Sequence, residues 1–188
     1  MHLACNSRYW YCAAADKILF HTIMSGAAMP IPDLIAISAA GRTIPGVPNL
    51  ANADALASLL RRPEFYPLFM KEVGGKYSLS VISADAYDPM TDEVLLLGGA
   101  RRSAESIAGE SLSPRGYLAQ RRLRQTPALA TLFGPRLWSV RVFVILGAAG
   151  SRINRATARI ATGSNPADNY CRADIRGNTL AILGCRPH

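Results

Sequence analysis

The sequence lacks the closely spaced cysteines and histidines from which proteins build zinc sites. Its four cysteines, at positions 5, 12, 171 and 185, contain no Cys-x-x-Cys pair, and its three histidines are scattered. Zinc ligands recur at short, regular spacings, so this pattern argues against a zinc centre. Free, reduced thiols in a cytoplasmic protein are the simpler interpretation.

Long apolar runs are also missing. The longest spans residues 142–149, far fewer than the roughly 20 residues that cross a bilayer as a helix. The N-terminus has no basic segment followed by an apolar one, so we expect no signal peptide. We therefore expect no membrane partner. Dinucleotide, Walker, Ser-His-Asp and paired-carboxylate motifs are absent as well.

Aromatic residues are few, whereas basic residues are in excess. Aromatics make up 7% of the chain, and the formal net charge is +8. A basic protein favours an anionic partner, and nucleic acid, a nucleotide or an anionic membrane would each fit by charge. No window interleaves aromatic with basic residues as base stacking requires, so nucleic acid is the less favoured partner. The basic residues are mostly arginines, which suit bidentate phosphate or carboxylate contacts.

Apolar periodicity predicts a mixed α+β fold of one domain or two small ones. It predicts a helix over 13–28, and a second helix that ends at Leu60 and is capped by Asn52 or Asp54. Strands are predicted at 34–37, 66–71, 77–82, 94–97 and 116–120. Residues 38–51 form a loop or linker, 88–92 a turn, and 103–110 a short helix or an ordered loop.

The second half is predicted to be mostly strand, at 137–146 and 156–161 and in a last hairpin of 170–175 with 179–183. If the first hairpin is symmetric about Gly150, Arg141 lies directly opposite Arg159. Opposed arginines repel, so this register indicates an anion between them. It is equally consistent with one arginine facing solvent, or with a carboxylate that separates the two.

The strand at 66–71 ends on Lys71 and leads into Gly74 and Gly75. Alternation puts Phe69 and Lys71 on one face of this strand. The two glycines can take positive φ, which lets consecutive N–H groups converge on an anion. A lysine beside a glycine loop is the chemistry of a phosphate site. The alternative is a solvated lysine before an ordinary turn.

The order of these elements resembles the ATP-grasp superfamily, most closely its alpha-L-glutamate-ligase-like and sugar-transfer-associated members. The resemblance covers roughly residues 14–182 and rests on six segments: 16–20 with 29–32, 66–71, 74–78, 117–120, 139–142 and 163–169. In turn, these resemble the family's N-terminal segment, its lysine strand, the glycine loop that closes on ATP, the hinge strand beside adenine, the arginine strand and the loop after it.

The resemblance implies two small α+β subdomains with antiparallel sheets that enclose a nucleotide cleft. They would span residues 61–122 and 123–188, after an N-terminal helix, short strand and linker over 1–60. The implied cofactor is ATP, used to form an acyl-phosphate on an unknown carboxylate acceptor for attack by an amine or thiol. The implied catalytic residues are Arg141 and Arg159, and the implied nucleotide-binding residues are Lys17, Lys71, Gly74, Gly75, Ser78, Leu118, Gln120, Asp168 and Asn169.

Several of these assignments have an ordinary structural alternative. Lys17 would then be a solvated helix residue, Gln120 a strand residue facing water, and Asp168 and Asn169 the side chains of a turn. A non-catalytic basic module that binds nucleic acid or a protein partner is the alternative function.

The chain also departs from the family pattern. Leu79 follows Ser78 where the family has glycine, Glu72 follows the strand lysine where it has proline, and Arg121 stands where the hinge often has an acidic residue. The family's Mg²⁺ ligands include a terminal Glu-x-Asn, yet no glutamate follows Glu110. The sequence therefore looks truncated at both ends, and we expect ATP binding with impaired catalysis.

Overall fold

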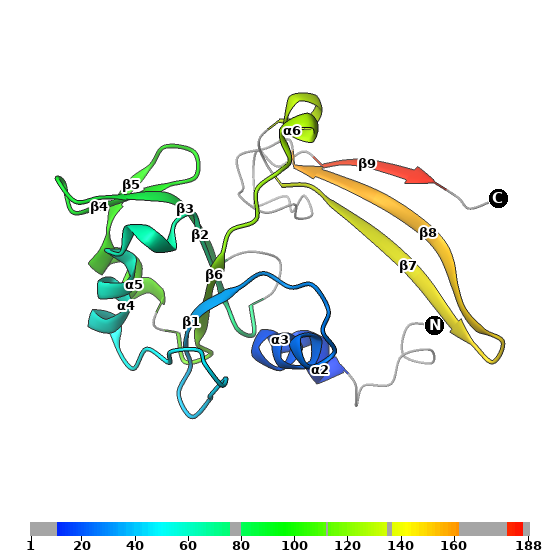
Figure 1. The fold of residues 1–188 in the computed structure, drawn as a ribbon, viewed down its shortest axis with the longest axis horizontal. Coiled ribbons are helices and arrows are strands. Elements are labelled where there is room, and N and C mark those ends of the chain that lie inside the picture. Colours follow the sequence, from blue (N-terminus) through cyan, green and yellow to red (C-terminus); the bar gives the residue numbers. More distant parts are fainter. Residues whose placement is uncertain (1–10, 76–79, 112, 135–136, 162–179, 186–188) are drawn as a thin grey trace. The chain divides into compact units, whose positions relative to one another are not determined.

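The computed structural model describes residues 11–75, 80–111, 113–134, 137–161 and 180–185 (Figure 1). The chain divides into two compact units, Met1–Arg122 and Leu123–His188. Mixed helices and antiparallel sheets confirm the predicted α+β class. The predictions for Ser78, Asp168, Asn169 and the strand at 170–175 lie outside the described residues.

The first unit is built on a six-stranded antiparallel sheet in the order β1-β6-β2-β3-β4-β5. Its strands are β1 (Leu34–Ser38), β2 (Leu68–Glu72), β3 (Val81–Asp88), β4 (Glu93–Leu96), β5 (Arg101–Ser103) and β6 (Tyr117–Arg121). The lysine strand β2 therefore lies in the interior of the sheet, between β6 and β3. The strand predicted at residues 34–37 is β1, which pairs with β6 in the same sheet.

Two helices cover one face of this sheet, α4 (Ala53–Leu60) and α5 (Ala104–Ser111) (Figure 1). Asn52 caps α4 by accepting a 2.9 Å hydrogen bond from the N–H of Ala55. Residues 103–110 were predicted to form either a short helix or an ordered loop, and the structure shows the helix α5. Leu60 of α4 and Ile107 of α5 are buried in one core cluster with Met70 of β2.

The other face is covered at one end by α3 (Lys17–Gly26), which follows the short helix α2 (Tyr11–Ala15). The predicted helix over 13–28 is interrupted at Asp16, whose side chain caps α3 by accepting a 2.9 Å bond from the N–H of Leu19. Ile18 of α3 is buried in a second core cluster with Ile37 of β1 and Leu118 of β6. These residues alternate with those that face α4 and α5, so α3 lies on the opposite side of the sheet.

The second unit contains α6 (Pro127–Phe133) and a three-stranded antiparallel sheet in the order β7-β8-β9. The strands are β7 (Ser139–Gly147), β8 (Gly150–Ala161) and β9 (Leu180–Cys185). Among the residues that the structure describes, no helix is long and apolar enough to span a membrane.

The predicted register of the β7–β8 hairpin is wrong. The turn lies between Gly147 and Gly150, and the register shifts by one residue after Phe143. Arg141 therefore pairs with Thr157, and Arg159 pairs with Ser139. The inference of an anion between directly opposed arginines loses its basis, because the two residues are not opposed.

Gly116 provides a test of the first unit's packing. It has φ of +73°, and a Cβ at this position would lie 2.6 Å from the carbonyl oxygen of Ser38. We expect Gly116→Ala to destabilise the chain by about 2 kcal/mol or more, through the clash and the strained φ. Urea unfolding of the full chain measures this change.

Gly109→Ala is the matched control, because a Cβ at Gly109 in α5 would meet nothing within 4 Å. This change should stabilise the chain by about 0.5–1 kcal/mol through helix propensity. Equal stability of Gly116→Ala and the parent chain would contradict the close β1–β6 approach.

Candidate functional site

The centre of the first unit's sheet carries polar and charged side chains on the face opposite α4 and α5. Leu68 and Met70 of β2 are buried against those helices, so Phe69 and Lys71 point the other way. The register aligns Lys71 with Leu118 and Val81, and Phe69 with Gln120 and Ser83. We call this surface the Lys71 face and define it as Phe69, Lys71, Val81, Ser83, Asp85, Leu118, Gln120 and Arg122.

Lys71 is a half-buried cation on this face. Its Nζ lies 5.9 Å from the centroid of the Phe69 ring, at the outer limit of a cation–π contact. Among the described residues it has no hydrogen-bond acceptor or carboxylate partner. Burial, and next the charge of Lys17, lower the pKa of Lys71 to about 8. An anion placed here would favour the charged form and offset both effects.

Lys17 reaches the same region from α3. Its Nζ donates hydrogen bonds to the carbonyl oxygens of Gly75 (2.6 Å) and Val73 (3.2 Å). Burial lowers the pKa of Lys17, although the charges of Glu72 and Asp16 act against this shift. The interpretation of Lys17 as a solvated helix residue is therefore wrong.

Asp16, whose charge also acts on Lys17, is itself paired with Arg42. The Arg42 guanidinium donates to both carboxylate oxygens, at 2.8 and 3.1 Å. This bidentate contact lowers the pKa of Asp16, against a smaller effect of burial. The ammonium groups of Lys17 and Lys71 are distant in sequence. They lie close enough at the end of β2 for the charge of Lys17 to lower the pKa of Lys71.

The glycines after β2 behave differently from the prediction. Positive φ values occur at seven described glycines, but Gly74 and Gly75 are not among them. The N–H of Gly75 donates to the carbonyl of Glu72 at 3.1 Å and closes a tight turn. A Cβ on Gly75 would lie 2.9 Å from the Cβ of Glu72, so glycine is needed for close approach. The carbonyls of Val73 and Gly75, and not converging N–H groups, face the Lys17 ammonium.

The two predicted hinge residues have different environments. Leu118 is 2% exposed and belongs to the second core cluster, so its side chain has a packing role. Gln120 is half-buried and lies opposite Phe69 on the Lys71 face.

Sequence reasoning missed a cluster at the far end of the Lys71 face. Arg122 donates to the hydroxyl of Ser83 at 3.0 Å and to the carboxylate of Asp85. Asp85 lies four residues along β3 from Val81, the partner of Lys71, which is about 13 Å at the usual strand rise of about 3.3 Å per residue. The alternation of side chains along a strand indicates which residues share a face of that strand. Only the register of β2, β3 and β6 brings Arg122 to Ser83 and Asp85.

The remaining predicted residues lie elsewhere. Arg141 is exposed on β7 and Arg159 belongs to β8, both in the second unit. On the same hairpin, the Arg155 guanidinium stacks 4.1 Å from the centroid of the Phe143 ring. In the described part of the chain, no three His, Cys, Asp or Glu side chains are grouped as metal ligands would be, so we assign no residue to Mg²⁺.

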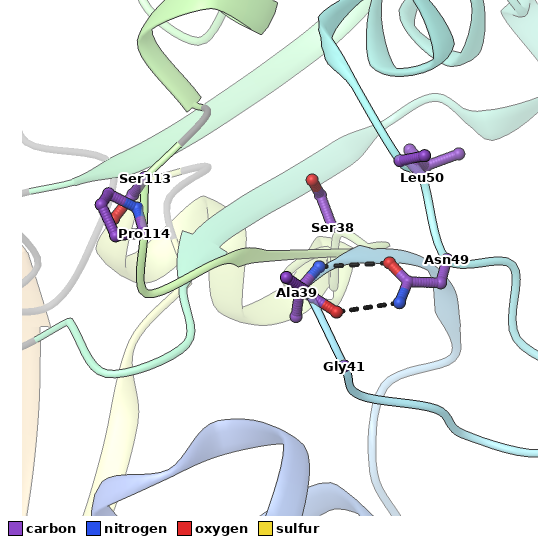
Figure 2. Close-up of a pocket in the computed structure, with 9 residues that line it drawn as sticks. Ser38, Ala39, Gly41, Asn49, Leu50, Ser113 and Pro114 are labelled. Atoms are coloured by element: carbon purple, nitrogen blue, oxygen red, sulfur yellow. Dashed lines mark hydrogen bonds between the residues drawn. The ribbon is translucent and has the colours of Figure 1, made fainter.

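A pocket of about 630 Å³ lies beside the end of β1 and contains none of the predicted site residues (Figure 2). The Asn49 side chain forms part of the wall of this pocket. It accepts from the N–H of Ala39 at 3.1 Å and donates to the carbonyls of Ala39 (2.8 Å) and Arg42 (2.7 Å). Because these bonds occupy the amide and the lining carries no charged side chain, the pocket offers little to bind an anion.

Comparisons of the chain with protein-family models, with curated proteins and with solved structures find no match.

The coupling between the two lysines can be measured. We expect Lys17→Met to raise the pKa of Lys71 from about 8, because the change removes a neighbouring positive charge. The pKa should stay below the ordinary value of about 10.4, because burial remains. NMR titration of the Lys71 side-chain methylene beside Nζ gives the value.

Lys17→Arg is the control, since it keeps the charge and should leave the pKa of Lys71 low. An unchanged Lys71 pKa in Lys17→Met would show that the two ammonium groups do not interact.

Proposed function

We propose that this chain is the ATP-binding part of an ATP-grasp ligase, a class that forms an acyl-phosphate on a carboxylate for attack by an amine or thiol. One observation carries the proposal. A half-buried lysine with no anionic or hydrogen-bonding partner among the described residues, Lys71, lies beside a second half-buried lysine, Lys17, at the glycine turn after a central strand. Two desolvated cations at one place fit a polyphosphate.

The two lysines would play different parts in holding the phosphates. Each ammonium has three N–H donors. Lys17 uses two of them on the carbonyls of Val73 and Gly75, so it is fixed in place with one donor left. Lys71 has all three free with respect to the described residues. Lys17 would orient the phosphate chain, and Lys71 would supply most of the electrostatic attraction, which is the main protein contribution in phosphoryl transfer.

The far end of the Lys71 face would receive the nucleoside. Gln120 presents an amide, and the Arg122–Asp85 pair presents a guanidinium and a carboxylate. These groups lie within about 13 Å of Lys71 along the strands, a span that suits a nucleotide with its phosphates at the lysines.

A second candidate function comes from the second unit. Arg141, Arg152 and Arg155 are exposed on its hairpin, and Arg155 stacks on an aromatic ring. This cationic surface favours binding of nucleic acid or an acidic protein. Such binding would weaken steeply with added salt and would not depend on ATP.

ATP should stabilise the chain through Lys71. At an ATP concentration about 100-fold above Kd, a ligand that binds only the folded state adds about 2.7 kcal/mol of stability. We expect Lys71→Ala to lose this gain, because the variant removes the partnerless cation. Thermal unfolding with and without ATP measures the effect.

Arg62→Ala is the charge-matched control, because Arg62 is exposed and contacts its near neighbours Glu64 and Phe65, away from the Lys71 face. It should keep the stabilisation by ATP. Equal stabilisation of Lys71→Ala and the parent chain would remove Lys71 from the site. No stabilisation of the parent chain, together with salt-sensitive DNA binding, would favour the second function.

The pKa of Lys71 predicts how ATP affinity depends on pH. Below pH 8 the ammonium form dominates, and above pH 8 the neutral amine does. Affinity should therefore fall as pH rises through 8, by at most about tenfold per pH unit. Isothermal titration calorimetry from pH 6.5 to pH 9.5 follows the change, and Lys71→Arg should abolish the fall because its charge persists.

Without ATP, the lowered pKa of Lys71 makes the free energy of unfolding depend on pH in the opposite direction to the ATP affinity. The folded pKa of Lys71 is about 8, below its ordinary value, so between these values the unfolded chain binds more protons. Stability should rise as pH rises from about 8 toward 10. Urea unfolding that shows no such Lys71-dependent rise would contradict the burial of this ammonium.

A further inference from the structure

A second pocket of the first unit, of about 440 Å³, lies between α3 and the start of β1. Its wall is largely apolar and is formed by Ile31, Pro32, Leu34, Ile44, Pro45 and Val47. Its polar lining comes from His21, Thr22, Ser25 and Asp33. The volume lies in the range of small-molecule sites, which typically combine an apolar wall with a few polar groups.

Asp33 is an unusual carboxylate for this chain, whose net charge is +8. Nine other carboxylates form ion pairs with arginines. Among the described residues, only Asp33 and Asp54 form none. Asp54 lies in the first turn of α4, where the helix dipole favours a negative charge. Asp33 has no such compensation, so its charge is free to act on a ligand at the pocket.

The pocket also contains polar groups with unused hydrogen-bonding capacity. The Nδ1 of His21 is buried and has no hydrogen-bond partner among the described residues, which is unfavourable for a polar group. The Ser25 hydroxyl makes no hydrogen bond with any described residue. Thr22 differs, because its hydroxyl donates to the carbonyl of Ile18 at 3.0 Å. A ligand carrying N–H donors could therefore use Asp33 and Ser25 together.

We propose that this pocket binds a small organic ammonium ion with an apolar body. The Asp33 carboxylate selects the positive charge, and the apolar wall takes the hydrocarbon part. The hydroxyl of Ser25 accepts an N–H group, and His21 lines the pocket beside it. The same carboxylate repels acids. This site is separate from the Lys71 face, and the inference holds whether or not the chain binds ATP.

The test is an NMR titration of the full-length, ¹⁵N-labelled chain with four probes. These are n-butylammonium, n-butanol, butyrate and ammonium, which separate the charge from the apolar body. We expect saturable shifts with n-butylammonium at the amides of His21, Ser25 and Asp33. Butyrate and ammonium should give no saturable shift there. n-Butanol should bind more weakly, by about twofold to fivefold, the usual range for one exposed ion pair.

Asp33→Asn should weaken n-butylammonium binding by the same factor and leave n-butanol unchanged. Asp54→Asn is the matched control, since Asp54 is the other described carboxylate without an ion pair and does not line the pocket, so its loss should not alter binding. The proposal is overturned if n-butanol binds as tightly as n-butylammonium, or if Asp33→Asn binds like the parent chain. Absence of saturable shifts at these amides with n-butylammonium would overturn it as well.

Discussion

The structure of the first unit depends on how β2 divides its side chains between two faces. Leu68 and Met70 pack into the core under α4 and α5, and this burial fixes the strand in the middle of the sheet. Since alternate side chains point to opposite faces, Phe69 and Lys71 must lie on the other side. A one-residue slip would put Lys71 in the apolar core, at a large desolvation cost. The hydrophobic core therefore fixes the position of the cation.

The second constraint is the attachment of α3 to the end of β2. Ile18 of α3 packs against Leu118 and Ile37. The preceding residue, Lys17, donates to the carbonyls of Val73 and Gly75. Apolar packing and ammonium–carbonyl bonds thus come from adjacent residues of one helix turn. The result is a pair of like charges held close together, in which the carboxylates of Glu72 and Asp16 act on Lys17 and an anion beside Lys71 would reduce the remaining cost.

Much of the fold could be predicted from the sequence because local patterns are strong there. The alternation of β2, the Asn52 cap of α4 and the turn before β4 all follow from side-chain period and backbone preference. The register of the β7–β8 hairpin could not be predicted. Gly150 marks a turn without fixing its centre, and the register shift after Phe143 changes which residues pair beyond it. Likewise, the expected positive φ at Gly74 and Gly75 is not found; glycine is needed at position 75 because the turn brings it close to Glu72.

By itself, the sequence determined that the chain is a basic α+β protein with a lysine strand leading into two glycines. Those features are local, because composition, period and glycine content act within a few residues. Only the tertiary structure placed Lys17 beside Lys71, aligned Arg122 with Ser83 and Asp85, and left Asp33 unpaired at an apolar pocket. These arrangements join residues distant in the chain, and strand register and helix packing decide which of them meet.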